Sequence, residues 1–220
     1  MASPSTEQSA VAASEGERWT RRGFRLVLGT MIYNIIEAVI ALWTGHRADS
    51  IALVGFGLDS LIEIAAAAVL LWRMTVQLRG AAEERVERAE RRVRRFVGLT
   101  FFALAAYVTL ESLWTLWSGE GPAESLIGIA LAIASLIIMP LIAFGKMRTA
   151  HALGSRALRA EAKETLACSY LSFTLLVGLV LNAVAGWWWA DPAAALLMVP
   201  WLVHEGKEAF EDEDEREGEH

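Results

Sequence analysis

The sequence has a single cysteine, Cys168, among its 220 residues, so an intrachain disulfide is excluded. No signal peptide is apparent, because residues 1–17 are small and polar and contain no apolar core. There is no glycine-rich phosphate loop, no nucleophile elbow and no paired-histidine motif. These absences argue against an enzyme, an organic cofactor and ATP-driven transport by this chain.

Apolar residues dominate the sequence. Hydrophobic residues make up 55% of the chain, the mean hydropathy is +0.37, and there are nine tryptophans. This composition exceeds the apolar share of a typical soluble domain, and tryptophans anchor helices at membrane interfaces. The formal net charge of −6 reflects an acidic C-terminal tail, whereas the segments flanking the apolar runs are basic. We therefore expect an integral protein of the inner or plasma membrane, surrounded by lipid.

The apolar residues fall into six segments, and a helix needs ~20 residues to cross a bilayer. We predict an all-α membrane protein with six transmembrane helices in a domain spanning residues 18–209, with disordered segments at 1–17 and 210–220. Between the second and third segments, residues 73–95 form a charged, cytoplasmic helical stretch whose glutamates dilute the positive field that nucleic-acid binding needs. The predicted membrane segments are 24–43, 50–72, 96–117, 126–144, 165–185 and the short 192–203.

Lysine and arginine gather on one side of these segments. The N-terminus, the loop at 73–95 and the loop at 145–163 are rich in Lys and Arg, whereas the three opposite loops hold only Arg47. Basic loops stay in the cytoplasm, so both termini are predicted to be cytoplasmic.

The second segment carries two acids, Asp59 and Glu63, four residues apart and thus on one helix face. An acid near the bilayer centre costs roughly 2.5–3.5 kcal/mol, so two of them require a compensating partner, which could be a bound cation, a proton or a basic residue on another helix. No Lys or Arg lies deep inside another apolar segment, which favours a bound cation. Three further polar residues, Asn34, Glu37 and Glu111, interrupt other segments and are candidates for a proton path or polar support.

The stretch SIALVGFGLDSLIE, residues 50–63, resembles the second helix of the cation diffusion facilitator family, which commonly reads like SGSLALLADALHSLVD. Asp59 and Glu63 occupy the two ligand positions of that motif. A second block, SRALRAEAKETLACSYL with the glycine-rich, DP-containing run after it, is similar to the family's SRALRADAWHHRSDVLTS block. The resemblance covers the first, second, fifth and sixth helices in the right order. The sequence is thus similar to a short form of the family that lacks its C-terminal cytoplasmic domain.

The resemblance implies a six-helix bundle, usually a homodimer, in which helices two and five hold a tetrahedral metal site. The usual His and Asp of helix five align with Glu164 and Cys168, so the implied ligands are Asp59, Glu63, Glu164 and Cys168. Three carboxylates and a thiol can bind Zn²⁺, Cd²⁺, Co²⁺, Fe²⁺ or Mn²⁺, and the thiol favours the softer ions. The expected function is proton-coupled efflux of such a divalent metal cation. A non-transporting metal sensor or partner protein of this fold, and an organic-cation transporter, are the alternatives.

Overall fold

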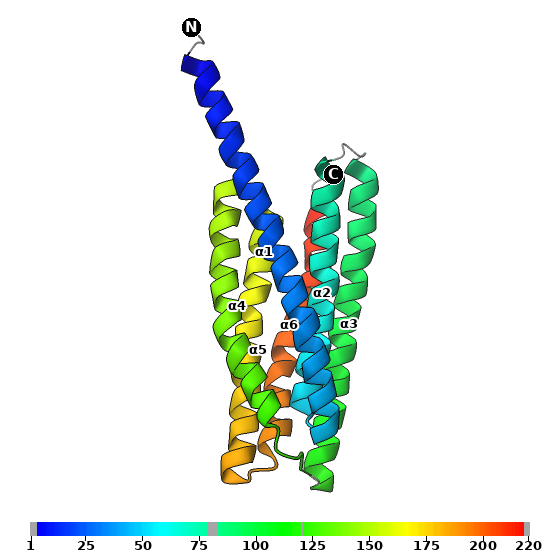
Figure 1. The fold of residues 1–220 in the computed structure, drawn as a ribbon. Coiled ribbons are helices and arrows are strands. Elements are labelled where there is room, and N and C mark those ends of the chain that lie inside the picture. The colour runs from blue at the N-terminus through cyan, green and yellow to red at the C-terminus, as the bar shows by residue number, and fades with distance from the viewer. Residues whose placement is uncertain (1–3, 79–82, 120, 218–220) are drawn as a thin grey trace.

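The structure, a computed structural model, describes residues 4–78, 83–119 and 121–217, and within these ranges every regular element is a helix (Figure 1). The helices are α1 (Pro4–Ala48), α2 (Ile51–Leu78), α3 (Glu83–Ser118), α4 (Leu126–Leu153), α5 (Arg156–Ala185) and α6 (Ala190–Glu217).

The helices run up and down along one direction, and the beginning of α1 and the end of α6 lie at the same end of the bundle (Figure 1). Helix α2 packs against α1, α3, α5 and α6, while α4 packs against α1 and α5. In the described part of the chain, α1 to α5 are long and apolar enough to span a membrane. The apolar part of α6 is shorter because an acidic stretch follows it, as the sequence indicates. The all-α fold of six helices agrees with the prediction.

The connection between α4 and α5 differs from the prediction. The sequence predicts a basic loop at 145–163, whereas the structure continues both helices through this region and leaves only Gly154 and Ser155 between them. Gly154 ends α4 in the left-handed conformation (φ 63°), which glycine adopts without strain. Ser155 then caps α5 by accepting a hydrogen bond from the backbone N–H of Leu158. The polar residues near this turn therefore lie on packed helices.

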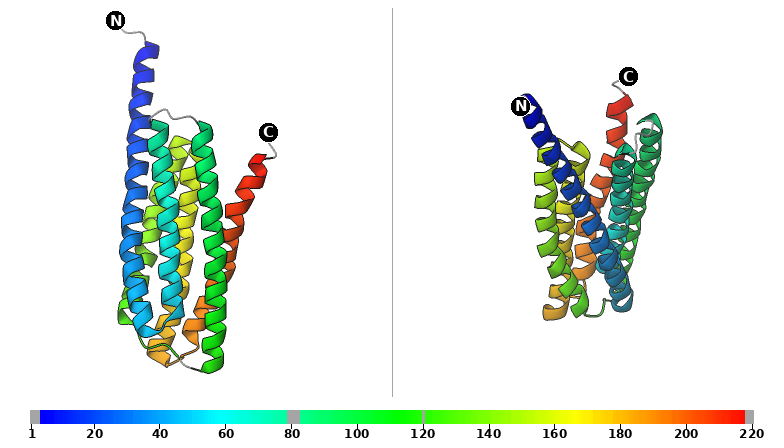
Figure 2. Two further views of the ribbon diagram at one scale, coloured as in Figure 1. Left: turned by 90° about the vertical axis from the view of Figure 1, so that its right-hand side faces the viewer. Right: turned by 45° about the horizontal axis from the view of Figure 1, so that its top comes forward.

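The two ends of the chain also differ from the prediction. Helix α1 begins at Pro4 and α6 continues to Glu217, over residues for which the sequence analysis expects disorder. Alanine, glutamate and glutamine in these segments favour a helix once a neighbouring helix has nucleated it. The N-terminal part of α1 extends beyond the other helices (Figure 2). The charged stretch at 73–95 is shared between the end of α2 and the beginning of α3, and residues 79–82 lie outside the described part of the chain.

The beginning of α2 is fixed by two side chains. The Ser50 hydroxyl accepts a hydrogen bond from the backbone N–H of Leu53 and donates one to the Asp191 carboxylate. Asp191 also accepts a hydrogen bond from the backbone N–H of Ala52, at 3.3 Å, and is fully buried. A carboxylate at a helix N-terminus satisfies free N–H groups and complements the helix dipole. These contacts join the start of α6 to the start of α2.

Close packing between α1 and α2 positions the polar residues of both helices. A Cβ atom at Gly57 would come within 2.9 Å of the Leu42 side chain, so only glycine allows the two helices to approach this closely. Beside this contact, Leu53 and Phe56 of α2 are fully buried in the main apolar core, together with Leu171 and Leu175 of α5. The core thus holds α2 against α1 on one side and α5 on the other.

Candidate metal centre

Asp59 and Glu63 both point into the bundle from α2. Asp59 is 4% exposed and Glu63 is 8% exposed, and they lie one helical turn apart on the buried face that includes Phe56. Helical periodicity explains this placement, since residues 56, 59, 60 and 63 follow spacings of three and four. The two carboxylates are therefore inside the protein rather than in contact with lipid.

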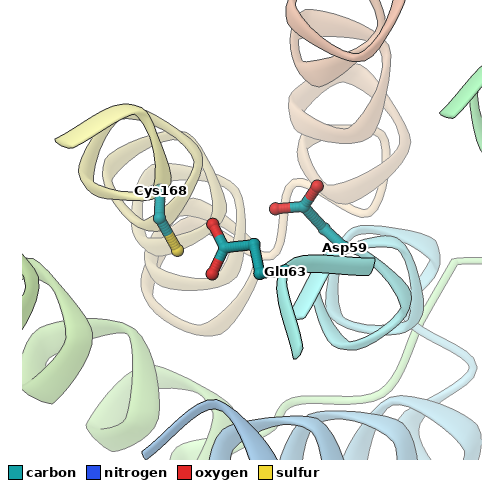
Figure 3. Close-up of side chains that lie close together, drawn as sticks. All are labelled: Asp59, Glu63 and Cys168. Carbon is teal, nitrogen blue, oxygen red and sulfur yellow. The ribbon is translucent and has the colours of Figure 1, made fainter. Parts of the chain in front are cut away.

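Helix α5 brings Cys168 to these carboxylates. The thiol is 1% exposed, and one ligand atom each from Asp59, Glu63 and Cys168 lies within 4.8 Å of the other two. Figure 3 shows the Glu63 carboxylate directed toward the sulfur, with the Asp59 carboxylate further from it, one turn earlier on α2. Metal–oxygen and metal–sulfur bonds of about 2.0–2.3 Å at tetrahedral angles put ligand atoms roughly 3.5 Å apart. A closure of about 1 Å would let the three side chains share one ion.

Glu164, the fourth predicted ligand, is half-buried and stands one turn before Cys168 on α5. It is not among the three residues whose ligand atoms converge. Its carboxyl is nevertheless close enough to Asp59 for the two charges to interact. The structure thus brings three of the four predicted ligands together and places the fourth beside them.

Helix α6 adds an acid that the sequence analysis missed. Glu205 is half-buried, and its charge acts on both Asp59 and Glu164. Partial burial, followed by the nearby Glu208 carboxylate, raises the pKa of Glu205 to about 7. Glu205 lies just beyond the predicted membrane segment 192–203, yet its spacing from buried Met198 and Leu202 places it on the inward face of α6. That periodicity is the signal that could have identified it.

A buried lysine also faces this region, which corrects the expectation that no basic residue lies inside the bundle. Lys146 of α4 is fully buried, and its Nζ donates hydrogen bonds to Glu161 Oε1 and Thr165 Oγ1, each at 2.8 Å. The sequence predicts that Lys146 lies in a cytoplasmic loop, because the apolar run ends at Phe144. Since α4 continues for two more turns, the side chain lies against α5 instead.

Asn34 and Glu37 form a polar layer between α1 and α2. Asn34 Nδ2 donates a hydrogen bond of 2.6 Å to Glu63 Oε2, so α1 holds one of the candidate ligands in place. The Ser60 hydroxyl donates to Glu37 Oε2 at 3.0 Å, and Glu37 is fully buried. Hydrogen bonds of this kind orient ligands and tune metal affinity in known metal sites. Asn34 thus has a supporting position, and Glu37 lies one turn further along.

Glu111 lies elsewhere. It is exposed on the outer face of α3, because the buried stripe of that helix passes through Phe101, Ala105, Val108 and Ser112. Its charge acts on Tyr107, one turn away on the same face. The structure therefore does not bring Glu111 to the acidic cluster.

Comparison with known proteins identifies the class to which this bundle belongs. Residues 27–206 match the model of the cation efflux transmembrane domain, so the chain belongs to the cation efflux family and is an integral membrane protein. The family transports divalent metal ions.

One relative carries the name of an uncharacterised transporter and comes from Synechocystis sp. It is 29% identical over 150 residues, which cover 67% of this chain and 48% of the relative. The chain thus spans about half the length of the curated relative that it matches.

Proposed function

We propose that the protein transports a divalent transition-metal cation out of the cytoplasm in exchange for protons. The observation that carries the proposal is the convergence of Asp59, Glu63 and Cys168 from two helices inside the bundle of a cation efflux family member. Two carboxylates and a thiolate suit Zn²⁺, Cd²⁺, Co²⁺, Fe²⁺ or Mn²⁺, with Glu164 or a water molecule as a fourth ligand. The metal is substrate here rather than a resident cofactor.

Proton exchange follows from the chemistry of these ligands. Carboxylates and a thiol bind the metal only after losing their protons, so metal binding releases protons and protonation releases the metal. When the site opens to a more acidic compartment, protons displace the ion; when it opens to the cytoplasm, the metal displaces protons. Rocking of helices around one central site would alternate this access. An inward proton gradient can then drive metal efflux, in a homodimer of this chain.

The test is metal flux in reconstituted vesicles that contain a metal-sensitive dye, measured with and without a pH gradient. The proposal predicts that flux of Zn²⁺ or Cd²⁺ follows the gradient and disappears in Asp59→Asn and Glu63→Gln. Glu124→Gln is a matched control, because Glu124 is an exposed acid in the loop before α4.

Two other outcomes would point to different functions. Metal binding without any flux would identify a sensor or partner protein, and competition by organic amines but not by metals would identify an organic-cation transporter. Flux that is indifferent to the pH gradient would refute proton coupling.

A further inference from the structure

The buried lysine has no role in the proposed exchange, yet it lies next to the proposed site. Lys146 is a side chain of α4 with none of its surface exposed, and both of its partners, Glu161 and Thr165, belong to α5. Burial of an ammonium group is costly unless it is paired and hydrogen-bonded. Lys146 meets this condition, because its ammonium pairs with Glu161 and also donates to the Thr165 hydroxyl.

The position of the ammonium group relates it to the candidate ligands. Thr165 follows Glu164 directly and precedes Cys168 by three residues. Because Lys146 Nζ is hydrogen-bonded to Thr165, it lies within about one turn of α5 from Glu164 and from Cys168. The charge of Lys146 acts on the carboxyls of Glu63 and Glu164. The described structure thus places a basic side chain at the edge of the cluster.

The contacts of Glu161 leave the ion pair incompletely satisfied. Glu161 Oε1 accepts from Lys146, whereas Glu161 Oε2 is buried without a hydrogen-bond partner. A buried ion pair is held firmly only when its remaining polar atoms are satisfied as well. The lysine side chain carries its ammonium group on a flexible four-carbon stem, so the ammonium can reach more than one neighbouring carboxylate. Glu164, one turn from Glu161 on the same helix, is the nearest alternative partner in sequence.

From these contacts we propose that Lys146 is a tethered cation that competes with the metal ion for the site carboxylates. Glu161 determines how strongly Lys146 competes, because it holds the ammonium away from those carboxylates. This inference rests on the proposed function, because it assigns a determinant of affinity to that same site. When Lys146 pairs with Glu161, Glu164 is free for the metal. When Lys146 turns to Glu164, it neutralises part of the negative charge that attracts the ion.

The proposal predicts opposite effects for two substitutions that break the same ion pair. Lys146→Met removes the competing cation and should tighten metal binding by roughly tenfold, within the range typical of coupling between neighbouring sites. Glu161→Gln releases the ammonium toward Glu164 and should weaken binding by a similar factor. Arg148→Met is the matched control, because Arg148 is an exposed basic residue two positions further along α4, and its removal should leave the affinity unchanged.

The experiment is a Cd²⁺ titration of the purified full chain in detergent, for wild type, Asp59→Ala, the three variants above and the double variant Lys146→Met/Glu161→Gln. In the double variant the loss caused by Glu161→Gln should vanish, because there is no ammonium left to release. This variant removes both charges together, so it also serves if Lys146→Met alone does not fold.

The results separate this inference from the proposal on which it rests. If wild type binds no Cd²⁺, or if Asp59→Ala binds as well as wild type, both ideas are wrong. If Asp59→Ala abolishes binding but Lys146→Met and Glu161→Gln weaken it alike, the ion pair only joins α4 to α5 and the competition is refuted. Equal affinity of Glu161→Gln and the double variant refutes it as well.

Discussion

Replacing Cys168 with serine tests whether the thiol is a ligand or a packing residue. Cys168 is 1% exposed and is the only sulfur donor in the cluster, so Cys168→Ser removes the soft ligand with little change in volume. Changing the outer contacts of a metal ligand typically costs 10- to 100-fold in affinity. Loss of the ligand itself should cost at least about 100-fold for Cd²⁺, or about 2.8 kcal/mol. The affinity for Mn²⁺ should change by only a few-fold, because a hydroxyl oxygen suits this harder ion.

The assay is competition of Cd²⁺, Zn²⁺ and Mn²⁺ against a metal-sensitive dye, with Ser172→Ala as the control. Ser172 is a fully buried residue one turn further along α5, and its hydroxyl bonds the backbone carbonyl of Cys168 rather than the cluster. The control should keep the metal ranking of wild type. An unchanged ranking in Cys168→Ser would show that the cysteine only packs, and that Asp59 and Glu63 use other partners.

Four further outcomes are expected. Asn34→Leu removes the 2.6 Å hydrogen bond to Glu63 and should lower metal affinity about 10- to 100-fold in the same titration, whereas unchanged affinity would show that α1 does not orient the ligand. Asp191→Ala removes one of the two side chains that cap α2 and should lower the free energy of unfolding by about 1–2 kcal/mol in a detergent melt, relative to the exposed-loop variant Glu124→Ala; equal stability of the two would contradict the capping role. Because partial burial raises the pKa of Glu205 from 4.5 to about 7, its contribution to stability is present below pH 4.5 and declines as the pH rises through 7. Glu205→Gln should therefore flatten the slope of stability against pH in metal-free melts, and an unaltered slope would refute this role of Glu205. Reporters fused after residue 120 should be extracellular and those near residue 85 or at the C-terminus cytoplasmic, so an extracellular C-terminus would refute the topology.

The parts of the fold that depend on hydrophobic burial could be predicted from the sequence. Each apolar segment falls on one helix, and the four-residue spacing of Asp59 and Glu63 placed both on the inward face of α2. The resemblance of the second block supplied Cys168, which does lie beside them. These features follow from helical periodicity and from the cost of exposing apolar groups to water or charged groups to lipid.

The polar surroundings of the site could not be predicted in the same way, because hydropathy marks where an apolar run ends but not where its helix ends. The turn at Gly154 and Ser155 depends on local capping, and it is this turn that allows Lys146 and Glu161 to meet. Glu111 illustrates the converse. The sequence shows that Glu111 would be costly to place in the bilayer, but only the orientation of α3 shows that its side chain is exposed.

In the proposed site, α2 and α5 jointly hold one metal ion, and X-ray absorption of the Zn²⁺-loaded protein tests this directly. We expect one sulfur neighbour at about 2.3 Å together with oxygen neighbours at about 2.0–2.2 Å. The sulfur signal should disappear in Cys168→Ser, and zinc binding should be lost in Asp59→Ala. A zinc ion surrounded by oxygen or nitrogen alone in the wild-type protein would contradict the proposed site.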